Sequence, residues 1–362
     1  MPPELTSTRP LRIWALLGAR RGGNNQVIAL AEALGLPYET KTLIYNDWRR
    51  LYPRVLGTSL RSLAPESRPL IAGEPPDVTL SIGHRSVPVV RAIKARSNGR
   101  TRAIHLGNPR ASPRHFDLVI TTPQYPVPDA PNVVRLPLAL GRPSQTPPKT
   151  EKTARFFDAL THPRRLLLLG GPTRYWTITA NTVAHAIAAL RRQAEADGGS
   201  LAVVGSPRTP KQALRAALRA IGGARAPMAV VPIEGPPSYA ELLAAADEIF
   251  VTSDSVSMMS EALRTGKPVG LVPIEHTRIG AVWLWLMDRI RPGRPVYPRD
   301  LRYFWAQLDR QGLAGTLDRP VSGAVPDVVT LAAAEVRRLL GLPVRPAIAV
   351  LDVVRSRPAS QA

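Results

Sequence analysis

The chain has 362 residues, of which 48 are Lys or Arg and 27 are Asp or Glu, so its formal net charge is +21. This length is too great for one ordinary α/β core and suits two domains. The sequence contains no Cys, which excludes disulfides, thiolate zinc sites and cysteine nucleophiles. A basic surface attracts nucleic acid, anionic lipid or phosphorylated substrates, and charge alone does not choose among them.

Hydropathy argues against a membrane span. No uncharged apolar run of the sequence reaches the roughly 18–20 residues that cross a bilayer. The N-terminus also lacks the basic-then-apolar pattern of a signal sequence. We therefore expect a cytoplasmic protein, either free or bound peripherally to the inner face of the membrane.

Residues 1–142 alternate between short apolar runs and helical spacing, which predicts a first Rossmann-like domain. Strands are expected at 11–17, 38–45, 78–82, 102–106, 118–122 and 133–140, with helices at 25–34 and 88–95. Apolar strands that alternate with helices predict a parallel sheet covered on both faces.

A polar, Pro-rich stretch at 143–150 is the expected linker, and the pattern then restarts over 151–340. Strands are expected at 165–169, 201–205, 229–233, 248–252 and 268–273, with helices at 181–194, 211–221, 239–246 and 257–264. Residues 341–362 form a tail. The predicted fold class is α/β, with two facing Rossmann-like domains whose ligands bind beyond the carboxyl ends of the strands.

The segment that follows the strand at 248–252 concentrates polar side chains. Small hydroxyl and carboxyl residues come first, and Glu261 lies about two helical turns later. These first residues are Ser253, Asp254, Ser255 and Ser257. A helix N-terminus with free amides and hydroxyls suits a phosphate, and a carboxylate suits ribose hydroxyls. The alternative is that Ser253 or Asp254 only caps the helix.

The first glycine loop, which includes Gly22, Gly23 and Asn24, follows a strand and opens a helix. Its glycines permit close approach of a ligand, and the helix N-terminus favours an anion. It does not match the GxGxxG fingerprint, and the alternative is a tight turn without a ligand.

The six histidines show no spacing that indicates a metal site, so we expect none. His84 lies directly after a strand and is the candidate general base, because a neutral imidazole accepts a proton near pH 7. His276 follows the strand after the expected phosphate-binding helix and is a candidate ligand contact. The alternative for each is a structural role.

Two segments mix apolar and basic residues, 46–63 and 282–290. This composition favours a membrane surface with anionic lipid. The alternative is that both are amphipathic helices that cover the core. A clustered basic-aromatic module is absent from the sequence, which argues against nucleic acid as a partner.

Several segments resemble the mitochondrial fission factor family first known from plants with elongated mitochondria, which has many bacterial members. They are GARRGGNNQVIALAEALG, LLLLGGPTRYW, VVGSPRTP, TSDSVSMMSEAL with TGKPV, and RYFWAQLDRQGLAG. The resemblance covers roughly residues 11–320. This chain has Arg20 and Arg21 where members often have an acidic residue and Lys.

That family in turn resembles GT-B glycosyltransferases, whose second domain binds a nucleotide sugar. The resemblance implies that Glu261 holds the ribose and that Gly170, Gly171 and 253–257 surround the diphosphate. Ser206, Arg208 and Thr209 would flank the nucleotide, and an ordinary strand-to-helix turn is the alternative for these three.

The implied activity is metal-independent transfer from a nucleoside-diphosphate sugar, with no further cofactor. The acceptor would be membrane-attached, such as a lipid-linked acceptor in envelope glycan or lipopolysaccharide assembly. The alternative is a non-catalytic adaptor that binds a membrane-remodelling partner.

Overall fold

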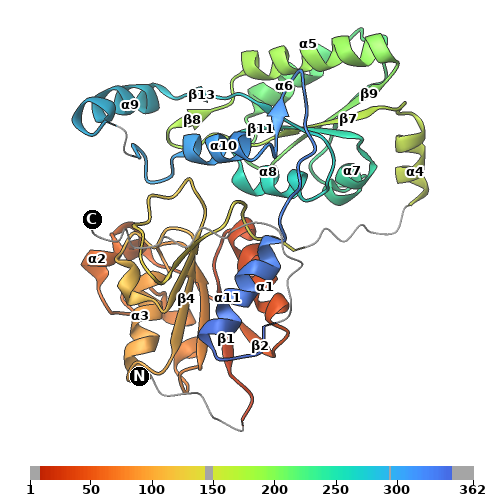
Figure 1. Ribbon diagram of the computed structural model, residues 1–362. Helices are drawn as coiled ribbons and strands as arrows, with labels where there is room; N and C mark the ends of the chain where they lie inside the picture. The colour runs from red at the N-terminus through yellow and green to blue at the C-terminus, as the bar shows by residue number, and fades with distance from the viewer. Residues whose placement is uncertain (1–8, 143–149, 293–294, 345–362) are drawn as a thin grey trace, which may run out of the picture. The chain divides into compact units, whose positions relative to one another are not determined.

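The computed structural model describes residues 9–142, 150–292 and 295–344, and its chain forms two compact units (Figure 1). Unit 1 contains the described residues up to Arg142 together with those from Pro326 onward, and unit 2 contains the described residues between them. Unit 2 thus ends at Val325, whereas the second domain expected from the sequence extends to residue 340.

Unit 1 is built on a six-stranded sheet in the order β2-β1-β3-β4-β5-β6, in which all neighbouring strands are parallel. The strands are β1 Ile13–Leu17, β2 Tyr38–Thr42, β3 Val78–Ile82, β4 Arg102–Leu106, β5 Leu118–Thr121 and β6 Val133–Arg135. All but the edge strand β2 are largely buried, as parallel strands covered on both faces require. The predicted parallel sheet is confirmed.

Four α-helices belong to the described part of unit 1: α1 Arg21–Leu34, α2 Pro53–Leu56, α3 Val87–Arg96 and α11 Val328–Leu339. Short 3₁₀ turns lie between them: η1 Asp47–Arg50, η2 Pro65–Ser67, η3 Pro69–Ile71 and η4 Pro113–His115.

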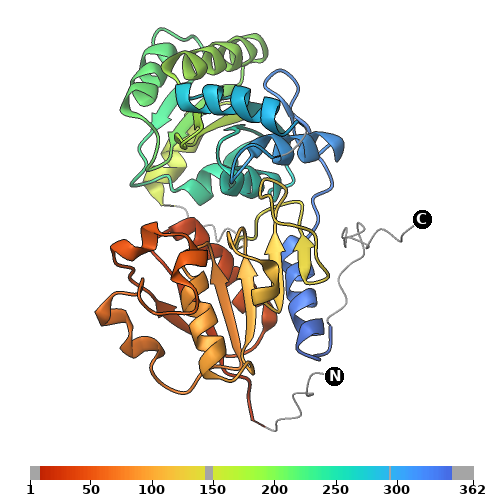
Figure 2. The same ribbon diagram turned by 90° about the vertical axis from the view of Figure 1, so that its left-hand side faces the viewer.

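Helix α11 returns to the first unit and lies beside α1 (Figures 1 and 2). It buries Ala332, Ala333 and Val336, and the Arg337 guanidinium donates to the Leu34 carbonyl oxygen at 2.6 Å. The limit of unit 2 at Val325 therefore differs from the boundary expected at residue 340, because α11 packs against α1, and Arg337 and Leu34 are 303 residues apart in the chain.

Unit 2 repeats the architecture with a parallel sheet in the order β10-β9-β7-β11-β12-β14. Its strands are β7 Arg164–Leu169, β9 Ser200–Gly205, β10 Met228–Val231, β11 Glu248–Thr252, β12 Val269–Val272 and β14 Gly315–Thr316. A separate antiparallel pair joins β8 Trp176–Thr177 to β13 Glu275–His276.

Seven helices belong to the described part of unit 2. They are α4 Glu151–Asp158, α5 Ala180–Asp197, α6 Lys211–Ile221, α7 Tyr239–Ala245, α8 Val256–Leu263, α9 Arg278–Ile290 and α10 Leu301–Arg310. One core cluster joins Leu167 and Phe250 of the sheet to Val183 and Ile187 of α5.

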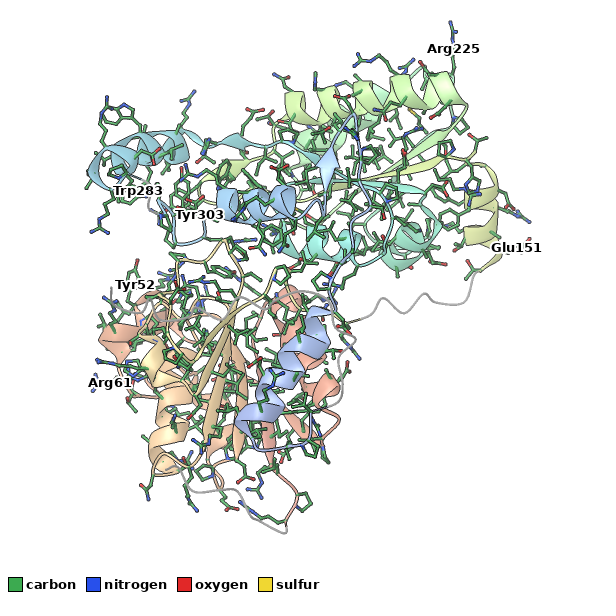
Figure 3. The ribbon with its side chains drawn as sticks, viewed as in Figure 1. Tyr52, Arg61, Glu151, Arg225, Trp283 and Tyr303 are labelled. Carbon is green, nitrogen blue, oxygen red and sulfur yellow. The ribbon has the colours of Figure 1, made fainter. Side chains whose placement is uncertain are left out.

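Helix α9 differs from the other helices because most of its apolar side chains face solvent (Figure 3). Trp285 is 60% exposed and Val282 is 65% exposed, and Gly280 is the buried residue of the helix. Trp283 is held by a hydrogen bond from its indole nitrogen to the Val296 carbonyl oxygen at 2.9 Å. The alternative that this segment covers the core is therefore wrong. No helix in the described ranges has the length and apolarity to cross a bilayer.

We predict that Phe250→Ala lowers the free energy of unfolding of unit 2 by about 3–5 kcal/mol, because it removes a buried ring from a closely packed core. Urea unfolding followed by circular dichroism measures the change. Leu218→Ala on α6 is the control, since Leu218 is 55% exposed and its truncation is expected to cost less than about 0.5 kcal/mol. Equal costs for the two variants would contradict this assignment of the core.

Candidate functional site

The candidate site of unit 2 lies where the strand order of its sheet reverses. Strand β7 is central, and the chain moves to one side through β9 and β10 but to the other side through β11 and β12. Ligands of open parallel sheets bind beyond the carboxyl ends of the strands at such a reversal. The residues that follow β7 and β11 are Gly170-Gly171 and Ser253-Asp254-Ser255, which are also candidates from the sequence.

The Asp254 carboxylate joins these two strand ends. One of its oxygens accepts a hydrogen bond from the Gly171 amide at 2.8 Å, and the other accepts from the Thr252 hydroxyl at 2.7 Å. The Thr252 oxygen in turn accepts from the Gly170 amide at 2.8 Å. Asp254 has no exposed surface, and burial raises its pKa, although these hydrogen bonds and Arg208 act in the opposite direction.

Gly170 and Gly171 are required by this close approach. A Cβ atom on Gly170 would lie 2.2 Å from an Asp254 carboxylate oxygen. A Cβ atom on Gly171 would lie 2.4 Å from the backbone oxygen of Arg208. The glycine pair therefore serves packing within the protein, whatever ligand it also contacts.

A third loop, after β9, completes the cluster. The Thr209 hydroxyl donates to the backbone oxygens of β7 and its loop, at 2.8 Å for Leu169, and accepts from the Ser206 amide at 2.7 Å. The Arg208 guanidinium lies 3.8 Å from the Asp254 carboxylate but is 52% exposed. The structure thus brings together the predicted residues of all three loops and leaves one cationic side chain open to solvent.

The hydroxyl residues at the start of α8 have different roles. The Ser253 hydroxyl donates to the Val272 carbonyl oxygen of β12 at 3.0 Å, so its proton is used within the fold. Ser255 occupies the N-cap position, but its side chain makes no capping hydrogen bond. Ser257 lies in the first turn and is half-buried. The suggestion that Ser253 or Asp254 caps this helix is wrong, since the helix begins after Ser255.

Glu261 projects from the second turn of α8 and is half-buried. Burial raises its pKa, whereas Arg264 and the nearby Tyr239 hydroxyl lower it. The buried Tyr239 hydroxyl makes no hydrogen bond of ordinary geometry within the described residues, so its approach to Glu261 is a loose one. This carboxylate can accept a further hydrogen-bond donor.

An aromatic cluster that the sequence did not predict lies next to this loop. The Trp176 ring contacts that of His276 at 3.9 Å between centroids and that of Trp305 at 4.9 Å. The Trp305 indole nitrogen donates to the Ser253 carbonyl oxygen at 2.8 Å. Of the three ring-bearing residues only His276 is a candidate from the sequence, and burial lowers its pKa. Two segments of the family resemblance contain Trp176 and Trp305, but nothing in the sequence indicates that they meet.

The remaining candidates belong to unit 1. The Asn24 side chain both donates to and accepts from the Gly18 backbone, at 2.7 and 2.9 Å, so it braces the loop. A Cβ atom on Gly23 would lie 3.3 Å from the Ile82 side chain, and the Gly22 carbonyl oxygen accepts from the Gln26 amide group. These contacts give the glycine loop a structural role.

His84 follows β3, and burial together with Arg110, Arg85 and Arg20 lowers its pKa to about 4. The imidazole is therefore neutral at pH 7 but a weak base.

No cluster of metal-ligating side chains occurs in the part of the chain that the structure describes.

Comparison with known proteins decides the family. The sequence profile described as mitochondrial fission ELM1 matches residues 21–283. The chain belongs to the mitochondrial fission ELM1 family. No curated protein sequence matches it. The resemblance found in the sequence is thus confirmed for this ELM1-family protein.

Solved structures similar to the ELM1-family chain share its fold at low sequence identity. A glycosyltransferase from Rickettsia africae has 11% identity and a TM-score of 0.51, with 91% of this chain and 99% of that chain covered. MurG from Acinetobacter baumannii has 13% identity and a TM-score of 0.47, with coverages of 91% and 100%. A UDP-N-acetylglucosamine 2-epimerase homologue from Listeria monocytogenes has 13% identity and a TM-score of 0.48, with coverages of 95% and 100%. The fold is of the GT-B type.

We predict that Gly171→Ala lowers the free energy of unfolding of unit 2 by about 1–3 kcal/mol, because the added methyl group must push the Arg208 backbone away. Thermal or urea unfolding measures this effect. Gly73→Ala is the matched control, since a Cβ atom there meets nothing within 4 Å. A Gly171→Ala variant as stable as the control would show that the loops are not packed this closely.

Proposed function

We propose that this ELM1-family protein is a metal-independent glycosyltransferase that binds a nucleoside-diphosphate sugar in unit 2. The observation that carries the proposal is the set of three strand-end loops held together by Asp254 and Thr209 at the reversal of the sheet. Such a reversal is the usual ligand site of an open parallel sheet. The similarity in fold to the Rickettsia glycosyltransferase supports the reaction class.

The groups at this edge suit a diphosphate leaving group. Helix α8 begins at the site, and its N-cap Ser255 leaves the first amides without a side-chain acceptor. Free amides at a helix N-terminus stabilise negative charge. The exposed guanidinium of Arg208 supplies a cation that matches phosphate oxygens. Catalysis would rest on positioning and on stabilising the charge of the departing diphosphate.

Glu261 is the proposed ribose ligand, and His276 with its aromatic neighbours is the proposed contact for the donor sugar. The carboxylate lies on the same helix that would bind the diphosphate, and burial raises its pKa. Hydrogen bonds from ribose hydroxyls would compensate for this desolvation.

The acceptor is proposed to be lipid-linked or otherwise attached to an anionic membrane surface, with the protein bound peripherally. Two exposed apolar regions with adjacent arginines support this. One contains Trp48 and Tyr52 at 50% and 59% exposure, beside Arg50 and Arg54. The other is α9, where Arg289 lies over the exposed Trp285 ring at 4.2 Å. Apolar side chains bordered by cations are typical of interfacial binding.

The second candidate function is a non-catalytic adaptor. The exposed apolar face of α9 is the observation that favours it, because such faces also bind protein partners. An adaptor would have no need of a Glu261 carboxylate that binds a ligand. Binding of sugar nucleotides therefore distinguishes the two functions.

We predict that Glu261→Ala weakens nucleoside-diphosphate binding about ten- to a hundredfold, because a charged hydrogen-bonding group worth about 1.5–3 kcal/mol is lost. Calorimetric titration measures the affinity, and thermal unfolding of the same sample measures stability. Glu234→Ala removes an exposed carboxylate of the same unit and is the control.

The two measurements on Glu261→Ala separate the alternatives. Weaker binding at unchanged stability supports the ribose ligand. Unchanged binding with a stability loss of less than about 0.5 kcal/mol would indicate an ordinary helix surface and would remove the support that Glu261 gives to a transferase. A stability loss of about 3–5 kcal/mol would identify a buried structural charge.

We also predict salt-sensitive binding to vesicles that contain anionic lipid. Arg50→Glu with Arg54→Glu should weaken it, because each basic residue near such a surface contributes about 1 kcal/mol. Vesicle flotation at low and high salt measures the effect, with Arg225→Glu, in a loop of unit 2, as the control. Equal binding to neutral and anionic vesicles would refute the electrostatic contribution.

A further inference from the structure

Unit 1 has its own reversal of strand order, between β1 and β3. Arg20 follows β1 at the N-cap position of α1, and His84 and Arg85 follow β3. Arg110 follows β4, the next strand of the sheet. Because the carboxyl ends of parallel strands meet at one edge, these four side chains come from adjacent loops at the position where such sheets bind ligands.

Two acidic residues with several basic partners lie at the opposite edge of the same sheet. Asp77 directly precedes β3, where it pairs with Arg9 at 3.1 Å and accepts from the Arg12 amide. Asp117 directly precedes β5, where it pairs with Lys94 at 2.6 Å and with Arg102 at 3.4 Å. The ion pairs thus neutralise the amino ends of the strands, and the carboxyl ends keep their positive charge.

In the part of the chain that the structure describes, three arginines at the carboxyl edge have no acidic partner. Within the described residues, no ion pair includes Arg20, Arg85 or Arg110. Of the acids in the neighbouring loops, Asp47 pairs with Arg50 and Asp129 pairs with Arg135. The edge therefore carries several cations that remain uncompensated.

These cations act on one another. Burial is the largest cause of the lowered pKa of His84, and the positive charges of Arg110, Arg85 and Arg20 lower this pKa further. Burial, Arg20 and Arg49 likewise lower the pKa of Arg85. Repulsion between like charges this close raises the free energy of the protein. An anion bound between them would offset that repulsion. The fully buried His105, whose Nε2 atom lacks a hydrogen-bond partner in the described chain, lies near enough to His84 to be affected by its charge.

We propose that the carboxyl edge of the unit 1 sheet binds a phosphate or diphosphate group, held by Arg20, Arg85 and Arg110 next to His84. Planar guanidinium groups match phosphate oxygens in geometry and charge. The N-terminus of α1 adds its positive dipole at the same edge. This site goes beyond the donor site of unit 2 and does not depend on it.

The bound anion has a consequence for His84. An adjacent negative charge favours the protonated imidazole, so binding raises the pKa of His84 from about 4. The weak base of the free protein then becomes a better proton acceptor near neutral pH. A phosphorylated ligand would in this way prepare the histidine beside it.

The test uses the full chain with isotope-labelled histidine and inorganic pyrophosphate as the probe. Proton titration by NMR follows the His84 and His276 signals, each assigned by its loss in the corresponding His→Gln variant. We expect pyrophosphate to raise the pKa of His84 by about one unit or more, as a close opposite charge does. Since His276 reports on unit 2, binding at the donor site alone would move only the His276 signal and would overturn this proposal without affecting the proposed function.

Charge variants locate the site. Arg20→Gln with Arg85→Gln should raise the pyrophosphate concentration that gives half of the His84 response at least about tenfold, because two charged hydrogen-bonding groups are lost. Arg100→Gln with Arg114→Gln removes the same charge from loops that precede β4 and β5 and should leave it unchanged. Equal losses in both double variants would indicate a general effect of net charge and would refute the site.

The source of the phosphate is distinguished by a second titration with phosphatidic acid in phosphatidylcholine vesicles. A His84 response to free pyrophosphate assigns a small phosphorylated ligand, and a response to the vesicles alone assigns a lipid headgroup. No response of His84 to either probe would overturn the proposal.

Discussion

The buried carboxylate of Asp254 is the constraint on which the arrangement of unit 2 depends. It accepts hydrogen bonds from groups on two strand ends that leave the sheet in opposite directions. Its position leaves no room for a side chain on Gly170, and the neighbouring Arg208 backbone leaves none on Gly171. The polar loops are thereby held in one geometry before any ligand arrives, which reduces the ordering that binding requires.

The two units share one sheet topology but differ in the charges at the reversal of strand order. At the reversal in unit 2, the Asp254 carboxylate accepts hydrogen bonds from within the protein, and Arg208 stays half-exposed. At the reversal in unit 1, the edge is lined by arginines without acidic partners within the described residues, whereas Asp77 and Asp117 form ion pairs at the other edge. One fold, used twice, thus presents a preorganised polar loop cluster in one copy and a field of positive charge in the other.

Local pattern predicts the framework of the fold but not its distant contacts. Strand Val78–Ile82 and helix Lys211–Ile221 lie where the sequence places them, because continuous apolar runs and helical spacing mark such elements. In the sequence Asp254 is one polar candidate among several. Its structural role depends on a contact with Gly171, which lies 83 residues earlier in the chain. Trp176 and Trp305 meet only through tertiary packing, and a single sequence carries no signal for such a pair.

The return of α11 to unit 1 also bears on how the chain folds. The helix covers α1, yet the ribosome makes it only after the whole of unit 2. During synthesis the apolar side chains of α1 that meet α11 therefore stay uncovered while unit 2 is free to complete its own core. A contact of this sequence separation slows folding, because a long loop must close first. The N-terminal unit is thus synthesised first but is the last to complete its packing. A chaperone would bind the nascent chain at the exposed side chains of α1.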